Sequence, residues 1–196
     1  MSSFKVNVEY KPVVNITALE GDIHRVIEGK DVTLTCTVDA NPAATKIEWK
    51  NSAGAVKSTT GTLTLSKVAL ADAGDYVCEA TNPRGVGTGK ATVDVLYRPK
   101  ITLAAKHEFV EGEPASVECV VDSNPTPSKV EWFKSKAIVA NSAWLNFTAI
   151  QRKEAALYEC SSSNVMNPTV GIKEESATSK NTEVNKGECL GIWSKG

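Results

Sequence analysis

The stretch DAGDYVC, residues 72–78, decides the fold predicted for this chain. A turn rich in aspartate leads into an alternation in which Tyr76 and Cys78 share one face and Val77 lies on the other. Such a period of two is typical of a strand with one buried side. A degenerate copy, EAALYEC, occupies residues 154–160. The sequence therefore predicts two copies of one all-β unit.

Further landmarks repeat at an offset of about 83 residues. They are Glu28-Gly29 with Glu111-Gly112, Cys36 with Cys119, Asn41-Pro42 with Asn124-Pro125, and Trp49 with Trp132. Short alternating segments lie between clusters of turn-forming residues, and we expect no helical segment of useful length. This arrangement favours tandem antiparallel β-sandwiches.

The spacing around the cysteines resembles that of the immunoglobulin superfamily over roughly residues 4–165. In each unit a Trp follows the first Cys by 13 residues and a Tyr precedes the second Cys by two. A narrower resemblance, carried by CTVDANP at residues 36–42 and CVVDSNP at residues 119–125, is to nephrin- and sidestep-type adhesion receptor ectodomains. There, a Tyr-x-Pro junction such as YKP or YRP joins neighbouring domains.

This resemblance implies two intersheet disulfides, two core tryptophans and two tyrosine corners. The residues are Cys36 with Cys78, Cys119 with Cys160, Trp49, Trp132, Tyr76 and Tyr158. Buried free thiols and zinc ligands are the alternatives, although no C-x-x-C or nearby His accompanies the cysteines. Disulfides would indicate an oxidising, extracellular compartment.

The predicted domains follow from the repeat. Residues 1–10 are expected to be the last strand of a truncated upstream domain, because VNVEYKP at residues 6–12 recurs as VDVLYRP at residues 93–99. Residues 11–98 form one immunoglobulin-like domain, and residues 99–172 form a second that lacks a full last strand. The polar residues 173–196 are predicted to be a disordered tail, in which Cys189 has no partner.

Composition excludes several classes of function. The chain has 196 residues, is 41% hydrophobic and 23% charged, and carries a net charge of -1, so neither sign favours nucleic acid. No apolar run is long enough for a membrane span, and the first ten residues lack the core of a signal peptide. We therefore expect no direct membrane insertion by this segment, although the parent protein would be a single-pass membrane protein.

An enzymatic function is not expected. The two histidines, His24 and His107, occupy equivalent positions in the repeat and are predicted to be surface residues near the first strand. No nucleophile elbow, phosphate-binding loop or paired acids are recognisable, so we expect no catalytic residue, metal or cofactor.

Two features relate to the cell surface. The sequons at Asn15 and Asn146 are predicted N-glycosylation sites, with Asn146 turned to solvent between inward-facing Leu145 and Phe147. The resemblance also implies a binding face on strands C, F and G. In the first unit this face consists of Lys46, Glu48, Lys50, Val77, Glu79 and Thr81. A solvated face of a spacer domain is the alternative interpretation.

The main hypothesis is a fragment or isoform of a cell–cell adhesion or recognition receptor ectodomain, located at the cell surface. Its partner would be a cell-surface immunoglobulin-superfamily protein, bound in a homophilic or heterophilic manner. A soluble secreted protein for immune or decoy binding is the first alternative. An intracellular muscle-type structural array is the second, and the sequons and complete cysteine pairs argue against it.

Overall fold

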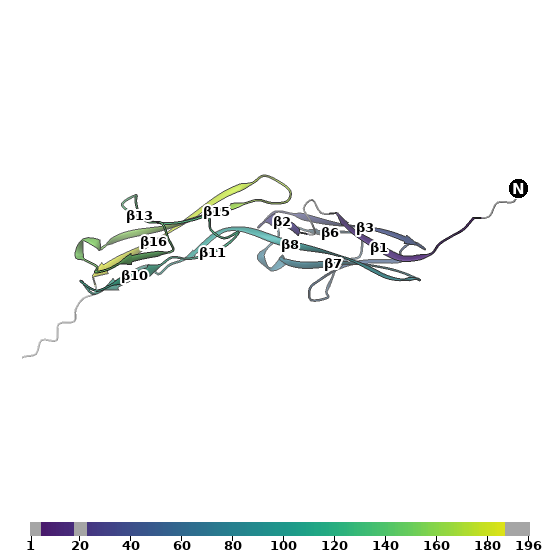
Figure 1. The fold of residues 1–196 in the computed structure, drawn as a ribbon, viewed down its shortest axis with the longest axis horizontal. Helices are drawn as coiled ribbons and strands as arrows, with labels where there is room; N and C mark the ends of the chain where they lie inside the picture. The colour runs from purple at the N-terminus through teal and green to yellow at the C-terminus, as the bar shows by residue number, and fades with distance from the viewer. Residues whose placement is uncertain (1–4, 18–22, 187–196) are drawn as a thin grey trace, which may run out of the picture. The chain divides into compact units, whose positions relative to one another are not determined.

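The computed structural model describes residues 5–17 and 23–186. It divides into two compact units (Figure 1). The first contains the chain up to Leu96 and residues Asn167–Ile172, and the second contains Tyr97–Met166 and the chain from Lys173. Within the described residues, the regular structure of both units is β-strand, apart from two 3-10 turns at Leu70–Asp72 and Arg152–Glu154. The predicted all-β class is confirmed.

The first unit is a sandwich of two sheets (Figure 1). One sheet has the order β1 (Tyr10–Thr17), β3 (Val32–Asn41) and β6 (Thr62–Leu65). The other has the order β8 (Gly85–Thr102), β7 (Gly74–Asn82), β4 (Lys46–Asn51) and β5 (Val56–Ser58), with β2 (Ile23–Ile27) parallel to β8.

The period-two pattern decides which side chains fill this sandwich. Leu34 pairs with Leu63 across β3 and β6, and both point inward beneath Trp49 of the opposite sheet. Leu34, Trp49 and Cys78 are completely inaccessible to solvent. Burying a large apolar side chain of this kind contributes about 1.5–3 kcal/mol. Where β3 and β6 pair, the outward positions are threonines, which suit a solvated strand surface.

A close approach explains the glycines at the start of β8. A Cβ atom at Gly87 would overlap the backbone carbonyl of Pro12, and one at Gly89 would lie 2.8 Å from the side chain of Val14. Strand β1 therefore lies against β8 at a distance that only glycine allows.

The second unit is also built from two groups of paired strands. One group pairs β10 (Ala115–Glu118) with β14 (Trp144–Phe147), and β11 (Val120–Asn124) with the end of β8. The second sheet has the order β13 (Ala137–Ala140), β12 (Lys129–Lys134), β15 (Ala156–Met166), β16 (Glu174–Lys186) and β9 (Lys106–Phe109). Its core contains Trp132 and Cys160 with no exposed surface.

The predicted disordered tail and missing last strand are wrong for residues 174–186. These residues form β16, which pairs with β15 continuously from Ala156–Val184 to Met166–Glu174. Thr182 and Val184 are fully buried, while Glu183 between them is exposed. The pattern escaped detection because the inward positions are mostly Ser and Thr, and backbone pairing with a long neighbouring strand compensates for their low hydrophobicity. Residues 187–196, which include Cys189, lie outside the described residues.

Other expectations need smaller corrections. The observed boundary lies between Leu96 and Tyr97, slightly before the predicted one, and Asn167–Ile172 group with the first unit. Residues 5–9 form no strand, and Tyr10 begins β1 of the first unit. The assignment to an upstream domain is therefore wrong for Tyr10, which pairs with Asn41 of β3, and stays a prediction for residues 1–9.

The expected exposure of His24 is wrong. It is only 7% exposed, because the alternation of β2 turns it inward with Val26. His107 is half-buried in the corresponding strand β9.

Candidate recognition face

Strands β4 and β7 bring the six predicted face residues together on the outer surface of the first unit. The register pairs Lys46 with Thr81, Glu48 with Glu79, and Lys50 with Val77. The residues between them, including Trp49 and Cys78, point into the core. The strand alternation alone therefore gathers this group, which we call the β4–β7 face.

The charges of the β4–β7 face form a continuous chain. Lys46 Nζ lies 2.9 Å from Glu48 Oε2, and Lys50 Nζ lies 3.7 Å from the same oxygen and 3.0 Å from Glu79 Oε2. The side chain of Glu48 is only 12% exposed. Lysine pairing thus offsets the like charges of Glu48 and Glu79, which lie directly opposite each other on the two strands.

These contacts shift the pKa values of two groups of the β4–β7 face. The hydrogen bond from Lys46 lowers the pKa of the Glu48 carboxyl, with further help from the charges of Lys46 and Lys50. The hydrogen bond to Glu79 raises the pKa of the Lys50 ammonium group. Both groups are therefore held in their charged forms, and the face presents fixed charge of both signs.

Strand β8 widens the face with residues that the sequence analysis did not assign. Val77 pairs with Lys90, Glu79 with Thr88, and Thr81 with Val86. These β8 residues are exposed, and the side chain of Val86 is 47% exposed. The signal was available in the alternation of residues 85–90, where Gly interrupts Val, Thr and Lys.

The framework residues occupy the positions that the resemblance implies. Disulfides join Cys36 to Cys78 and Cys119 to Cys160, with Cα–Cα distances of 6.4 and 6.3 Å. Trp49 and Trp132 are fully buried. The Tyr76 hydroxyl donates a hydrogen bond to the Asp72 carbonyl at 2.9 Å, and the Tyr158 hydroxyl donates one to the Glu154 carbonyl at 3.0 Å.

Two buried asparagines add a contact that the sequence analysis missed. The Asn82 amide donates to the carbonyls of Tyr10 and Pro42, and the Asn164 amide donates to those of Tyr97 and Pro125. Each Asn follows the second framework Cys by the same interval, and this repeated spacing was the available signal.

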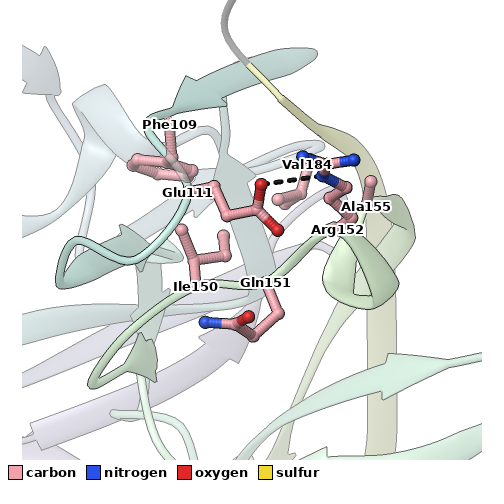
Figure 2. Close-up of a pocket in the computed structure, with 7 residues that line it drawn as sticks. All are labelled: Phe109, Glu111, Ile150, Gln151, Arg152, Ala155 and Val184. Atoms are coloured by element: carbon pink, nitrogen blue, oxygen red, sulfur yellow. Dashed lines mark hydrogen bonds and ion pairs between the residues drawn. The ribbon is translucent and has the colours of Figure 1, made fainter.

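A small, partly open pocket in the second unit has too little room for a ligand. Its volume is about 10 Å³, which matches a single water molecule. It is lined by Phe109, Glu111, Ile150, Gln151, Arg152, Ala155 and Val184. Figure 2 shows the contact between Arg152 and Glu111 as a dashed line. The distance from Arg152 Nε to Glu111 Oε2 is 2.7 Å, and this hydrogen bond raises the pKa of Arg152.

The outer face of the second unit has a different character. Phe133, Leu157, Glu159 and Asn181 contribute to an open hollow of about 170 Å³. Leu157 on β15 is 58% exposed, and Ile138 on β13 of the same sheet is 52% exposed. The two units therefore do not present the same chemistry on equivalent strands.

Across residues 5–17 and 23–186, no group of three or more His, Cys, Asp or Glu could hold a metal ion. In the same part of the chain, no helix is long and apolar enough to cross a membrane. Asn15 on β1 and Asn146 on β14 are both exposed on the sheets that oppose the β4–β7 face and its counterpart.

Two disulfide-linked sandwiches with buried tryptophans and tyrosine corners define a tandem immunoglobulin-like protein. The immunoglobulin domain family matches residues 11–82 and 98–164. The chain belongs to the immunoglobulin superfamily.

Relatives and solved structures agree with this assignment. Kin of IRRE-like protein 3 of Homo sapiens is 30% identical over 141 residues, covering 70% of this chain and 18% of that protein. Kin of IRRE-like protein 1 of Homo sapiens is 37% identical over 130 residues, covering 65% of this chain and 16% of that protein. The crystal structure of DIP-gamma Ig1+Ig2 has a TM-score of 0.70 at 21% identity and covers 90% of this chain and 98% of that chain. The chain thus spans less than a fifth of these curated relatives.

Proposed function

We propose that this chain is a non-catalytic extracellular recognition module, acting as a segment of a receptor ectodomain for cell–cell adhesion or recognition. Its partner is a cell-surface protein of the immunoglobulin superfamily, either a second copy of this chain or a different member. Family membership supports the type of partner, and the two disulfides suit an oxidising extracellular compartment.

The β4–β7 face is the observation that carries this proposal. Lys46, Glu48 and Lys50 alternate in sign along one strand, and Glu79 continues the pattern on the next. Charges arranged in this way select partners, because a complementary pattern is attracted while a displaced one juxtaposes like charges. Since the face is already internally paired, it contributes specificity and orientation more than affinity.

Strand β8 supplies the apolar part of the same surface. Val86 is exposed and pairs with Thr81, whereas Val77 is half-buried and pairs with Lys90. The charged strip therefore borders one exposed and one half-buried aliphatic side chain. A mixed surface of this kind resembles protein interfaces, which combine apolar contact with a polar rim.

Purified full-length chain tests the proposal by bead binding. Beads coated with the chain are mixed with each other and with beads that carry individual immunoglobulin-superfamily ectodomains. The face variant is Lys46→Glu/Lys50→Glu. Its matched control is Lys30→Glu/Lys67→Glu, which makes the same charge change at two exposed positions outside β4 and β7.

The expected result is binding in at least one pairing, lost in the face variant and kept in the control. Absence of binding throughout, or equal loss in both variants, would contradict the proposal.

A further inference from the structure

Strand β14 presents an exposed aromatic ring next to a predicted glycosylation site. Trp144 and Asn146 occupy alternate positions and point outward, whereas Leu145 between them is 4% exposed and belongs to the core. Trp144 is 45% exposed. Trp49 and Trp132, by contrast, are fully buried.

The amide of Asn146 is oriented for modification. The Ser116 hydroxyl donates a hydrogen bond to Asn146 Oδ1 at 2.7 Å across the β10–β14 pair. Among the described residues, no hydrogen bond engages Nδ2, which is the atom that an N-linked glycan occupies. Thr148, which completes the sequon, is exposed just after the strand.

The first unit shows that neither side chain is needed to build this sheet. There, Leu63 and Leu65 take the inward positions of Leu145 and Phe147. Thr62 and Thr64 take the outward positions that Trp144 and Asn146 occupy in the second unit. The hydroxyl oxygens of Thr64 and Thr33 lie 3.2 Å apart, and this contact corresponds to the one between Asn146 and Ser116. The Trp–Asn pair is therefore an addition to the framework of the second unit.

We propose that Asn146 carries an N-linked glycan whose first N-acetylglucosamine packs against the ring of Trp144. Residues two positions apart on a strand are separated by about 6.8 Å, which is within reach of the first sugar ring. The C–H face of the sugar is apolar, so its contact with the indole removes apolar surface of both partners from water. The proposal rests on the extracellular location that the proposed function includes.

The glycan also has a structural consequence. It covers an exposed tryptophan on the sheet formed by β10 and β14, away from the sheet that contains β12 and β15. The second sequon lacks such a neighbour, because Asn15 has Val13 and Thr17 two positions away on β1. The sugar at Asn15 therefore has no aromatic ring beside it on its own strand.

Tryptophan fluorescence tests the contact directly. The full chain with Trp193→Phe is secreted from eukaryotic cells. Its three remaining tryptophans are Trp49 and Trp132, which are buried, and Trp144, which is exposed and therefore accessible to the quencher. Acrylamide quenching is measured with the complete glycan, after trimming to one N-acetylglucosamine, and after enzymatic removal of the glycan from the folded protein. The variant Thr148→Ala provides a chain never modified at this site, and Thr148→Ser retains the sequon.

The expected quenching constant is about twofold lower with the complete or trimmed glycan, because the sugar shields one of the two ring faces. Asn15→Gln, the matched control, leaves this constant unchanged. An Asn146 found unmodified by mass spectrometry in the secreted chain would overturn the proposal. Quenching that is unaffected by removal, or protection that disappears on trimming to one sugar, would overturn it equally. These results are independent of whether the β4–β7 face binds a partner.

Discussion

Asn82 Nδ2 lies 2.8 Å from the backbone carbonyl oxygen of Tyr10 and donates a hydrogen bond to it. The same nitrogen donates to the Pro42 carbonyl at 2.7 Å, and Asn82 is only 4% exposed. Asn164 repeats the arrangement in the second unit with Tyr97 at 2.9 Å and Pro125 at 3.1 Å. In each unit, the side-chain amide of a buried Asn therefore binds the first residue of the repeated Tyr-basic-Pro sequence. The Asn lies on β7 in the first unit and on β15 in the second.

Replacing this amide should destabilise the first unit. Asn82→Ala removes two part-buried hydrogen bonds to backbone carbonyls, and we expect a loss of about 2 kcal/mol in the free energy of unfolding. Asn82→Asp should be at least as damaging, because it sets a carboxylate against the two carbonyl oxygens. Urea unfolding of the disulfide-intact chain measures both effects. A loss below about 0.5 kcal/mol in either variant would show that the contact is not structural.

The two tyrosine corners should contribute similar amounts. Tyr76→Phe and Tyr158→Phe each remove one hydrogen bond to a backbone carbonyl and retain the ring, so each should cost about 1 kcal/mol. Urea unfolding of the two single variants and the double variant provides the measurement. Because the residues belong to different units, the double variant should show additive losses. Strong non-additivity would contradict this independence.

Acid should weaken the first unit through its paired carboxylates. The hydrogen bond from Lys46 lowers the pKa of Glu48, and hydrogen bonds from Lys90 and Thr92 lower that of Asp75. A lowered pKa gives stability that is present above the ordinary values of 4.5 and 3.8 and is lost as pH falls through the folded-state values. Thermal unfolding between pH 6 and pH 2 should therefore show a falling midpoint.

The variant Glu48→Gln provides the comparison for this pH effect. This variant should reduce the dependence of the unfolding midpoint on pH. Added salt should reduce the dependence further, because it screens the exposed Lys90–Asp75 ion pair that remains. An unchanged slope in Glu48→Gln would mean that other groups cause the acid loss.

Strand β16 should be an integral part of the second unit. Val184 is fully buried in the core, so Val184→Ala should cost about 2 kcal/mol, whereas Glu183→Ala at the adjacent exposed position should be nearly neutral. Hydrogen exchange of the amides at residues 174–184 should be slow. Rapid exchange throughout this segment, or equal effects of the two variants, would restore the expectation of a disordered tail.

The sequence predicted the elements whose chemistry is distinctive. Cys36, Trp49 and Tyr76 carry a spacing that specifies the sandwich, and their large buried side chains leave a clear period of two. Strand β16 was missed because Thr182 and Ser176 hold inward positions that hydrophobic periodicity does not recognise. Such a strand forms only when a neighbouring strand supplies the hydrogen bonds. Its formation therefore depends on tertiary contacts and not on its own sequence pattern.

The candidate face was only partly predictable. Alternation placed Lys46, Glu48 and Lys50 on one side of a strand. The contact of Lys50 with Glu79, however, depends on the register between β4 and β7. The contribution of Val86 and Lys90 depends on the pairing of β7 with β8. The sequence did not predict this strand clearly, because Gly87 and Gly89 occupy its inward positions in place of hydrophobic residues. The repeated interval after the second framework Cys marks Asn82 and Asn164, but it does not reveal their partners, which lie far away in the chain.

Cell aggregation tests the central claim most directly. The full chain is displayed on non-adherent cells through an added membrane anchor, and these cells are mixed with each other and with cells that display single immunoglobulin-superfamily ectodomains. The account predicts clusters in at least one pairing, retained by Lys30→Glu/Lys67→Glu and abolished by Lys46→Glu/Lys50→Glu at equal surface expression. Equal clustering by the two variants, or no clustering in any pairing, would contradict it.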